Sequence, residues 1–420
     1  MLSRKRNIKL GTRVLKLGSR GTDVGQLQQK LKDFGYEPGP VDNIFGYLTQ
    51  EALEFFQRDY RLRIDGIAGE EVFALLKQDN LPVTRRVHLV QPGETLQDIA
   101  DQYQVGPEAF IDNHKKSIYP GQQLVFFDRE VWGVLGFDLP ALDSFNVNQE
   151  LITGVFISVN PEKGIASQTK SISGPKIAQV EFEDEELVSI HTILTKGKVR
   201  KNFLKFCSEA AGKMDGIYLP WEQVSRVDGF RYYKLLRRIK KQLGDKRLLV
   251  TLTLGMPRWN LLGGIDFAQV SRIVDQVVIK IAQPDPSLID SEKEQYESLI
   301  HQMLHYVPAY KILLSVPVYG VMWNQADPSA WERLSHGQAM TKVFRHGARL
   351  TADDSGKKYY QFYLKGEHWG LRISSLDQLN QVIALANRYN LAGIVLDRLG
   401  EEDKRLWTKL ASHFSIRKKL

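Results

Sequence analysis

Eight apolar, β-branched runs recur through the last two thirds of this 420-residue chain and constrain its fold more than any other feature. In order they read VWGVLGF, LITGVFISV, LVSIHTIL, GIYLPWE, RLLVTLTL, QVVIKIA, KILLSVPVYG and LAGIVLD. Continuous runs of this kind are typical of strands buried on both faces of a parallel sheet. Helical patterns such as DGFRYYKLLRRIKKQLG separate most of them, although none is clear between the second and third runs. The pattern predicts an α/β fold with a (β/α)8 TIM-like barrel over residues 131–415.

Residues 14–77 predict a separate domain of three helices. TDVGQLQQKLKDFG begins at a cap-like Thr22 and places its apolar residues on one helical face. The turns VDNIFG and IDGIAG each lead into a further helix, and their Asp side chains can accept turn amides. The segment resembles the peptidoglycan-binding domain, and the residues that match are Leu27-Gln28, Leu31, Phe45-Gly46, Thr49, Phe56-Gln57 and Asp65-Gly66.

Residues 86–128 predict a second small domain with the order strand, helix, helix, strand. VHLVQPGETLQDIADQYQV reads as a strand, a Pro-Gly turn and a helix that opens near Thr95, and YPGQQLVFF reads as a turn and a closing strand. The segment resembles LysM. That resemblance implies a shallow groove for glycans that contain N-acetylglucosamine, lined by Gly93, Thr95, Leu96, Ile118, Pro120 and Gly121.

Charge narrows the classes of partner without choosing one. The chain has 57 Lys and Arg against 49 Asp and Glu, and its net charge of +8 suits nucleic acid, anionic lipid or an acidic wall polymer. The charges are scattered, with small clusters such as Arg237-Arg238, and we expect them to form ordinary solvated surface. We expect no nucleic-acid partner, because no recognition motif is present. No run reaches the roughly 18 apolar residues of a membrane span.

The amino-terminal stretch, the single cysteine and the histidine spacing indicate no secretory signal peptide and no cofactor. The amino-terminal stretch has charges but no apolar core, so it does not read as a secretory signal. A single cysteine, Cys207, excludes an intrachain disulfide and reads as a small core residue. His301 and His305 lie one helical turn apart, as zinc ligands can, but Gln302 stands where a metalloprotease has Glu. We expect no metal.

The barrel segment resembles the chitinase-like glycoside hydrolase family 18, and most closely its spore-type members that carry LysM repeats. YKILLSVPVYGVMW matches the seventh strand of that family, and the stretch from LSHGQAM to LAGIVL follows the spore-type tail. The resemblance implies hydrolysis assisted by the N-acetyl group of the substrate. It also implies that a Glu after strand four protonates the leaving oxygen, and that an Asp two residues earlier orients the acetamido group.

The family motif DGxDxDxE aligns with DGIYLPWE in this sequence. The acid is kept as Glu222, whereas Tyr218 and Pro220 stand at the positions of the other two motif carboxylates. The strand-six Tyr-Asp pair of the family aligns with Ala282-Gln283, and its strand-eight Trp aligns with Asp397. Losing one preorganised electrostatic group commonly costs about 10²–10³-fold in rate. The motif therefore predicts an impaired active site.

Aromatic side chains at a barrel mouth often stack on sugars. Trp323 directly follows a strand-like run, whereas Trp259 and Trp369 read more readily as packing residues. The residues predicted to contact glycan in the barrel are Tyr218, Trp221, Gln283, Tyr319, Trp323 and Asp397.

Together these patterns predict a protein that binds peptidoglycan or another N-acetylglucosamine-containing wall glycan and whose barrel is catalytically impaired. The alternative is an active N-acetylglucosaminidase that acts on cortex peptidoglycan with Glu222 as acid, with Asp397 replacing a lost carboxylate. A third class, a basic nucleic-acid binder, has no supporting motif. The spore-type resemblance implies association with the spore or cell wall, and with spore coat or cortex proteins.

Overall fold

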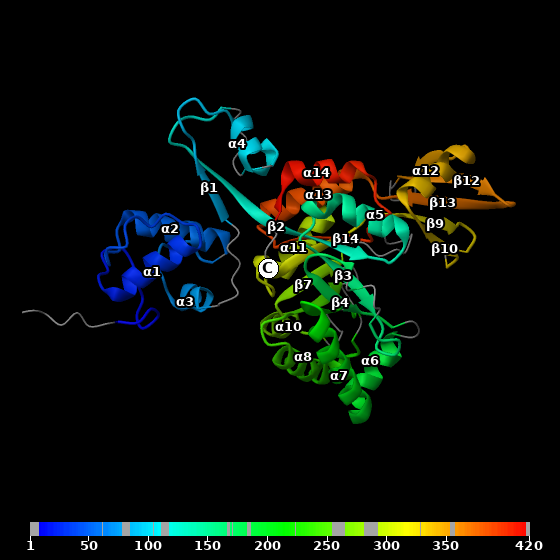
Figure 1. Cartoon of the computed structure of the whole chain (residues 1–420), viewed down its shortest axis with the longest axis horizontal. Coiled ribbons are helices and arrows are strands. Elements are labelled where there is room, and N and C mark those ends of the chain that lie inside the picture. Colours follow the sequence, from blue (N-terminus) through cyan, green and yellow to red (C-terminus); the bar gives the residue numbers. More distant parts are fainter. Residues whose placement is uncertain are drawn as a thin grey trace, which may run out of the picture. The chain divides into compact units, whose positions relative to one another are not determined.

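The structure is a computed structural model of the chain. The residues that it describes are 8–60, 62–77, 85–103, 105–110, 117–165, 169, 171–182, 186–222, 224–253, 265–280, 293–327, 329–352 and 358–416. The chain divides into two compact units, which are Met1–Asp128 with Pro308–Tyr310 and Ser412–Ser415, and Arg129–Val307 with Lys311–Ala411 and Ile416–Leu420. Figure 1 follows the chain by colour from one end to the other.

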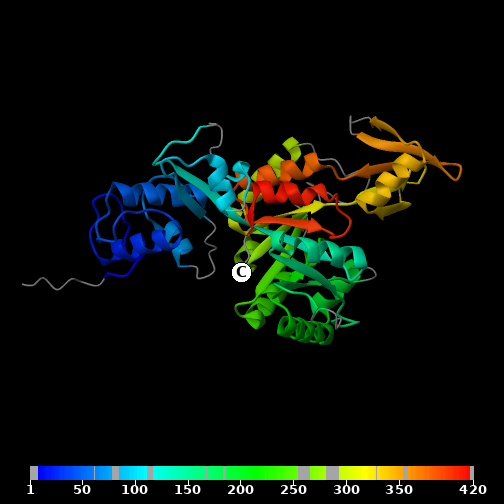
Figure 2. The ribbon, with the colours of Figure 1, turned by 45° about the horizontal axis from the view of Figure 1, so that its top comes forward.

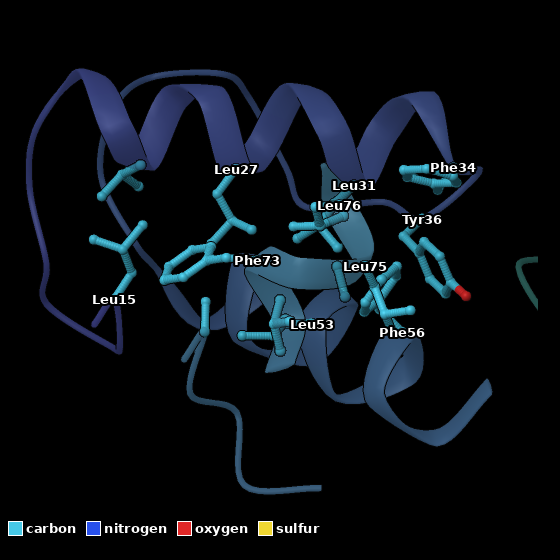
Figure 3. Packing of buried hydrophobic residues seen from close by; sticks show 14 of the residues in the cluster. Leu15, Leu27, Leu31, Phe34, Tyr36, Leu53, Phe56, Phe73, Leu75 and Leu76 are labelled. Atoms are coloured by element: carbon cyan, nitrogen blue, oxygen red, sulfur yellow. The ribbon is translucent and has the colours of Figure 1, made fainter. Parts of the chain in front are cut away.

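The first unit opens with three helices, as predicted. They are α1 (Thr22–Asp33), α2 (Tyr47–Asp59) and α3 (Glu70–Leu76). Their apolar faces meet in one core, where Figure 3 shows Leu27 and Leu31 of α1 facing Leu53, Phe56 and Phe73. The prediction that Thr22 caps α1 is wrong. Gly21 is the N-cap, and the Thr22 hydroxyl instead accepts the backbone N–H of Ile8 at 2.8 Å.

Two buried glutamines hold the turns that precede α2 and α3. Gln28 donates to Asp42 Oδ1 at 3.0 Å, and Gln57 donates to Asp65 Oδ1 at 2.8 Å. Each glutamine also donates to the carbonyl oxygen two residues after its aspartate, at 3.0 Å in both turns. Each aspartate accepts the N–H of that same residue, at 2.9 and 3.0 Å. The prediction that these Asp side chains accept turn amides is therefore confirmed.

The second part of this unit has the predicted strand and helix order. Its elements are β1 (Arg85–Leu89), α4 (Leu96–Tyr103), the 3-10 turn η1 (Pro107–Ala109) and the start of β2 (Gln123–Leu135). β1 pairs antiparallel with β2, from Arg85 opposite Phe127 to Leu89 opposite Gln123. A small core that includes Ile99, Ala100 and Phe126 fills the space between the strands and α4.

Eight parallel strands of the second unit close into a barrel, because β2 pairs with both β14 and β3. The strands that follow β2 in chain order are β3 (Gly154–Val159), β4 (Lys176–Val180), β5 (Gly216–Leu219), β6 (Arg247–Thr253), β7 (Gln276–Lys280), β8 (Ile312–Pro317) and β14 (Gly393–Asp397). The predicted (β/α)8 fold is confirmed.

One of the eight predicted strands is wrong. LVSIHTIL lies in the helix α6 (Glu186–Thr195), and the third barrel strand is the earlier segment KIAQV, which forms β4. The apolar residues Ile190, Ile193 and Leu194 recur with helical spacing and are buried, so they form one face of α6. β4 escaped the prediction because it is short and contains Gln179, a polar residue inside an otherwise apolar run.

Helices surround this barrel in Figures 1 and 2. They are α5 (Leu139–Asn148), α6, α7 (Gly197–Lys213), α8 (Gly229–Leu243), α10 (Phe267–Ile273), α11 (Lys293–Leu304), α13 (Leu376–Arg388) and α14 (Arg405–His413). Shorter elements are η2 (Gln149–Leu151), η4 (Arg226–Asp228), η5 (Ala309–Lys311) and β15 (Ser415–Ile416). Cys207 is buried in α7, which confirms it as a core residue.

An extra layer lies between β8 and α13 in the sequence. Its five strands are β9 (Gly320–Asn324), β10 (Trp331–Leu334), β11 (Arg349–Ala352), β12 (Lys358–Leu364) and β13 (Glu367–Ile373). They form an antiparallel sheet in the order β10-β9-β13-β12-β11, and α12 (His336–Arg345) packs on one face. None of the helices in the described parts of the chain is both long and apolar enough to cross a bilayer.

Candidate functional site

Polar side chains fill the barrel just above its apolar core. The core inside the strands includes Phe156, Ile177, Tyr218, Leu249, Val278 and Val395. Because side chains alternate along a strand, the residue two positions after each of these also faces inward. Those residues are Ser158, Gln179, Pro220, Thr251, Lys280 and Asp397. All of them except Pro220 are polar, so the carboxyl ends of the strands carry a largely polar ring, where barrel enzymes have their sites.

The centre of this ring is an ion pair between Glu222 and Lys280. Lys280, the last residue of β7, donates from Nζ to Glu222 Oε1 at 2.6 Å. Burial lowers the pKa of the Lys280 ammonium, but Tyr218, Glu222 and Asp397 raise it more, so its pKa lies above the ordinary lysine value. Lys280 therefore stays charged.

Tyr218 forms the floor beneath this pair. Its hydroxyl bonds to the Thr251 hydroxyl, and its ring packs on Phe156 with 4.9 Å between centroids. Burial raises the pKa of the Tyr218 hydroxyl to about 12, against the smaller lowering effects of Lys280 and Thr251. At neutral pH Tyr218 is therefore an uncharged hydrogen-bonding group at the position of a family carboxylate.

Asp397 ends β14 and adds a second carboxyl group to the ring. Burial raises the pKa of Asp397, while Lys280 and Arg333 lower it by less. Arg333 lies over the ring of Tyr319 at 5.2 Å and pairs with Glu401 at 3.2 Å. Burial, reinforced by Asp397, raises the pKa of the Tyr319 hydroxyl. Tyr319 and Asp397 thus belong to the same electrostatic site as Lys280.

The other motif positions do not supply a carboxylate to the mouth. Pro220 is buried after the end of β5 and has neither a side-chain acceptor nor a backbone donor. Asp215 precedes β5, where its Oδ2 accepts the backbone N–H of Lys176 at 2.8 Å. That contact lies at the amino end of the strands, so Asp215 secures the pairing of β4 and β5.

The structure contradicts the predicted glycan contact of Trp221. It is fully buried, and its ring packs on Phe203 of α7 at 5.5 Å and Tyr232 of α8 at 6.0 Å between centroids. The reason is alternation, because Pro220 and Glu222 face the barrel interior and Trp221 must face outward. It holds the helices on the barrel and has no exposed surface for a sugar.

The remaining predicted aromatics lie in the extra layer. Trp323 is 9% exposed on β9 and packs against Tyr359 at 5.5 Å between ring centroids. Its glycan contact stays a prediction. Trp369 packs on the core of this layer, as expected of a packing residue. Gln283 and Trp259 lie outside the described residues.

Sequence reasoning missed Lys280, although the alternation of β7 indicates it. Val278 is an interior core residue, so Lys280 had to face the mouth. The family alignment drew attention to Ala282-Gln283 instead.

The predicted LysM residues come together at one end of the β1–β2 pair. The backbone N–H of Gly121 donates to the Val90 carbonyl at 2.8 Å, and the Val90 N–H donates to the Gln122 carbonyl at 2.9 Å. These bonds place the turn containing Gly93 beside the turn containing Pro120 and Gly121. Gly93 and Gly121 have φ of 89° and 83°, a region that favours glycine.

Side chains brace the first of these turns. Asp98 accepts the Thr95 backbone N–H at 2.9 Å while Thr95 Oγ1 accepts the Asp98 N–H at 3.2 Å, which fixes the start of α4 near Thr95 as predicted. Leu96 and Ile118 pack on the small core. Tyr119, which was not predicted, is 64% exposed beside Pro120 and can stack on a sugar.

His301 lies in α11 and His305 directly follows that helix, and the two rings contact Tyr389 and Tyr306. His301 Nε2 lies 2.9 Å from the Tyr389 hydroxyl, and His305 Nδ1 lies 2.8 Å from the His301 carbonyl oxygen. Among the described residues, no three His, Cys, Asp or Glu side chains are grouped as a metal site requires.

Comparison with known proteins identifies the two amino-terminal domains. The family described as a putative peptidoglycan binding domain matches residues 20–76, and the LysM domain family matches residues 88–127. This chain carries a peptidoglycan-binding domain followed by a LysM domain. Over 63 residues it is 41% identical to the spore cortex-lytic enzyme of Bacillus cereus, a match that covers 15% of this chain and 24% of that protein. The chain therefore matches about a quarter of the length of this curated relative.

Comparison with solved structures shows the fold of this chain. The Bacillus cereus spore cortex-lytic enzyme SleL superposes with a TM-score of 0.60 at 16% identity, covering 97% of this chain and 99% of that one. A chitinase from Chromobacterium violaceum superposes with a TM-score of 0.57 at 17% identity, covering 67% and 98%. At these identities the likeness establishes the fold. The expected resemblance to chitinase-like barrels is confirmed at that level.

Proposed function

We propose that this protein binds peptidoglycan through N-acetylglucosamine-containing glycan, and that its barrel contacts glycan with little or no hydrolysis. Support for binding comes from the two amino-terminal domains. The first matches a family described as a putative peptidoglycan binding domain, and the second matches the LysM domain family. Within LysM we assign the contacts to the adjoining turns, at Gly93, Thr95, Pro120 and Gly121, with Tyr119 added as a stacking surface.

The observation that carries the second half of the proposal is the bond from Lys280 to Glu222. A general acid must hold a proton until the leaving oxygen takes it. Glu222 is the candidate acid, yet Lys280 donates to it at 2.6 Å, so a cation already occupies one oxygen of its carboxyl group. In addition, Tyr218 and Pro220 supply no charge to a developing oxazolinium ion. The site therefore suits a sugar hydroxyl that donates to Glu222.

A second candidate function, hydrolysis by a rearranged acid pair, has one observation in its favour. Burial raises the pKa of Asp397, so this carboxyl group holds a proton to a higher pH than an exposed aspartate does. Lys280 links Asp397 electrostatically to Glu222. In an active enzyme of this kind, Asp397→Asn would abolish turnover as completely as Glu222→Gln.

We further propose association with the spore or cell wall, and with spore coat or cortex proteins as secondary partners. The support is the likeness of the amino-terminal segment to proteins named spore cortex-lytic enzymes. Immunolocalisation on sections of sporulating cells of the source organism tests this directly. Signal confined to the mother-cell cytosol at all stages would refute it.

Two measurements separate the candidate functions. Sedimentation of the full chain with purified sacculi, with soluble chito-oligosaccharide as competitor, tests binding. Release of reducing ends from cortex peptidoglycan by the natural chain, Glu222→Gln and Asp397→Asn tests hydrolysis. We expect competed binding and no release above a no-protein blank. Release that disappears in both variants would establish the rearranged enzyme.

A further inference from the structure

Two neighbouring helices, α7 and α8, together carry 11 of the 57 basic residues of the chain. The α7 segment GKVRKNFLKFCSEAAGK has five basic residues and one acidic residue, and the α8 segment GFRYYKLLRRIKKQL has six basic residues and no acidic one. The net charge of the two helices therefore exceeds the +8 of the whole chain. The predicted cluster Arg237-Arg238 lies on α8, within this larger group of basic residues.

Most of these basic side chains point to solvent. The apolar residues of α8, among them Leu235, Leu236 and Ile239, are buried on the barrel, so the opposite face of the helix is basic. α7 likewise buries Phe203 and Phe206. The two helices pack against each other on the same side of the barrel, as Figure 1 shows, and their outer faces form one surface.

Few of these cations are neutralised within the protein. Lys205 pairs with Glu209 at 3.6 Å, Arg231 with Asp228 at 3.1 Å, and Lys240 with Asp275 at 2.7 Å. Seven others are exposed and have no acidic partner in the described parts of the chain: Lys198, Lys201, Lys213, Lys234, Arg237, Arg238 and Lys241. Their mutual repulsion is unfavourable in the isolated protein and is relieved when an anionic surface approaches.

We infer that the outer faces of α7 and α8, the α7/α8 surface, dock onto the carboxylate groups of a cell-wall polymer such as peptide-bearing peptidoglycan. Exposed lysines and arginines without a groove suit a repeating polyanion whose charges are spread out. The choice of wall over other polyanions rests on the proposed function. The two amino-terminal domains would hold the chain on peptidoglycan, which raises the local concentration of its stem-peptide carboxylates at this surface.

Two other classes of polyanion fit this surface less well. Phe230 is the exposed aromatic residue of α8, at 68% exposure with the Lys234 ammonium 4.3 Å from its ring centroid, so this helix offers a single ring for stacking on nucleic-acid bases. The other large apolar residues of α8 are buried, which leaves few side chains to insert among lipid tails. Duplex DNA and anionic vesicles are therefore the comparison ligands.

The test uses two full-length variants with equal net charge. In the surface variant, Lys201, Arg237, Arg238 and Lys241 are changed to Gln. In the control variant, four exposed basic residues outside α7 and α8 are changed to Gln, namely Arg345, Arg349, Lys358 and Lys404. Both variants lose four positive charges, so a difference between them reports the place of the charges and not their number.

Binding is measured by sedimentation with purified sacculi in 0.05 M salt, and with sacculi whose carboxylates have been converted to amides. We expect the surface variant to bind untreated sacculi about tenfold more weakly than the control variant, because a local charge cluster attracts its partner more strongly than the same charge dispersed. Amidated sacculi should bind the natural chain and both variants with similar, reduced affinity. At 0.5 M salt the difference should shrink, because screening shortens the range of the charges.

Equal binding of the two variants to untreated sacculi would overturn the inference, as would equal binding of the natural chain to amidated and untreated sacculi. A surface variant that loses affinity for duplex DNA or phosphatidylglycerol vesicles, but not for sacculi, would assign the surface to that other partner. Failure of chito-oligosaccharide to compete with any of the proteins would refute the proposed glycan binding. The amidation comparison would still decide the role of this surface.

Discussion

Replacing Lys280 with Met removes the cation at the centre of the barrel mouth and tests how its charges are balanced. Lys280 donates to Glu222 at 2.6 Å and lowers the pKa of Asp397. Methionine fills a similar volume but leaves both carboxyl groups without this partner. We therefore expect the variant barrel to be less stable, and more so at pH 8 than at pH 4.

The structure sets the size of this effect. Breaking a buried ion pair by removing one partner costs about 3–5 kcal/mol. The Lys280 and Glu222 side chains are 27% and 24% exposed, so solvent screens part of the loss, and we expect about 3 kcal/mol at pH 8.

The loss should depend on pH. Burial already raises the pKa of Asp397, and without Lys280 that pKa rises further. A carboxyl group with a raised pKa in the folded state stabilises the fold below its unfolded pKa, and that stability is lost as the pH rises through the folded pKa. The destabilisation by Lys280→Met should therefore fall to about 1 kcal/mol or less at pH 4, where Asp397 can take up a proton.

Urea denaturation followed by tryptophan fluorescence measures this in the full chain, because all seven tryptophans lie at or beyond Trp132 and report on the second unit. Lys234→Met is the matched control, since Lys234 is exposed and has no acidic partner among the described residues. We expect it to change stability by less than about 0.5 kcal/mol. A Lys280→Met effect below 1 kcal/mol, or one that is equal at pH 4 and pH 8, would refute the reasoning.

Three further predictions concern other parts of the chain. Burial raises the pKa of Tyr218 to about 12, so its contribution to stability is complete below the unfolded tyrosine pKa of about 10 and is lost as the pH rises towards 12. Tyr218→Phe should therefore flatten the alkaline loss of barrel stability in urea titrations between pH 9 and 12. An unchanged slope would contradict this. Arg85 is 7% exposed and donates to the Gly35 carbonyl at 2.8 Å, so Arg85→Ala should destabilise the first unit by about 2 kcal/mol in calorimetry. Arg86 is exposed, and Arg86→Ala should change the stability of this unit far less. Equal effects of the two substitutions would refute the role of Arg85. A fragment of residues 1–128 should sediment with sacculi nearly as well as the full chain, and Tyr119→Ala should weaken it several-fold; binding that resides in residues 130–420 instead would place the main glycan contacts in the barrel.

The sequence predicted most of the barrel because its strands are continuous apolar runs, which only burial on both faces explains. It failed at β4, where interior Gln179 interrupts the apolar run, and at α6, where β-branched residues fall on one helical face. Helix and strand have similar composition in such short segments. What separates them is the closure of the sheet, and that is a tertiary property.

Part of the candidate site could be predicted from the sequence, some residues from the family alignment and others from the alternation of side chains along strands. Glu222 and Asp397 came from the family alignment, and the structure places both at the mouth with Lys280, which that alignment did not indicate. Alternation along β7 and β5 would have found Lys280 and excluded Trp221, because it fixes the direction of a side chain from its position in the strand. The α7/α8 surface could not be read from the sequence, since helix packing alone brings its two charged segments together.

The central claim is that Lys280 and the substituted motif leave Glu222 unable to act as an acid. Reducing-end release from purified cortex peptidoglycan by the natural full-length chain tests it most directly, with Glu222→Gln as the control and the sedimented, bound fraction measured in the same tube. We predict bound protein, no release above the no-protein blank over a day, and no difference between the natural chain and Glu222→Gln. Turnover by the natural chain that disappears in Glu222→Gln would contradict the claim and establish a working glycosidase.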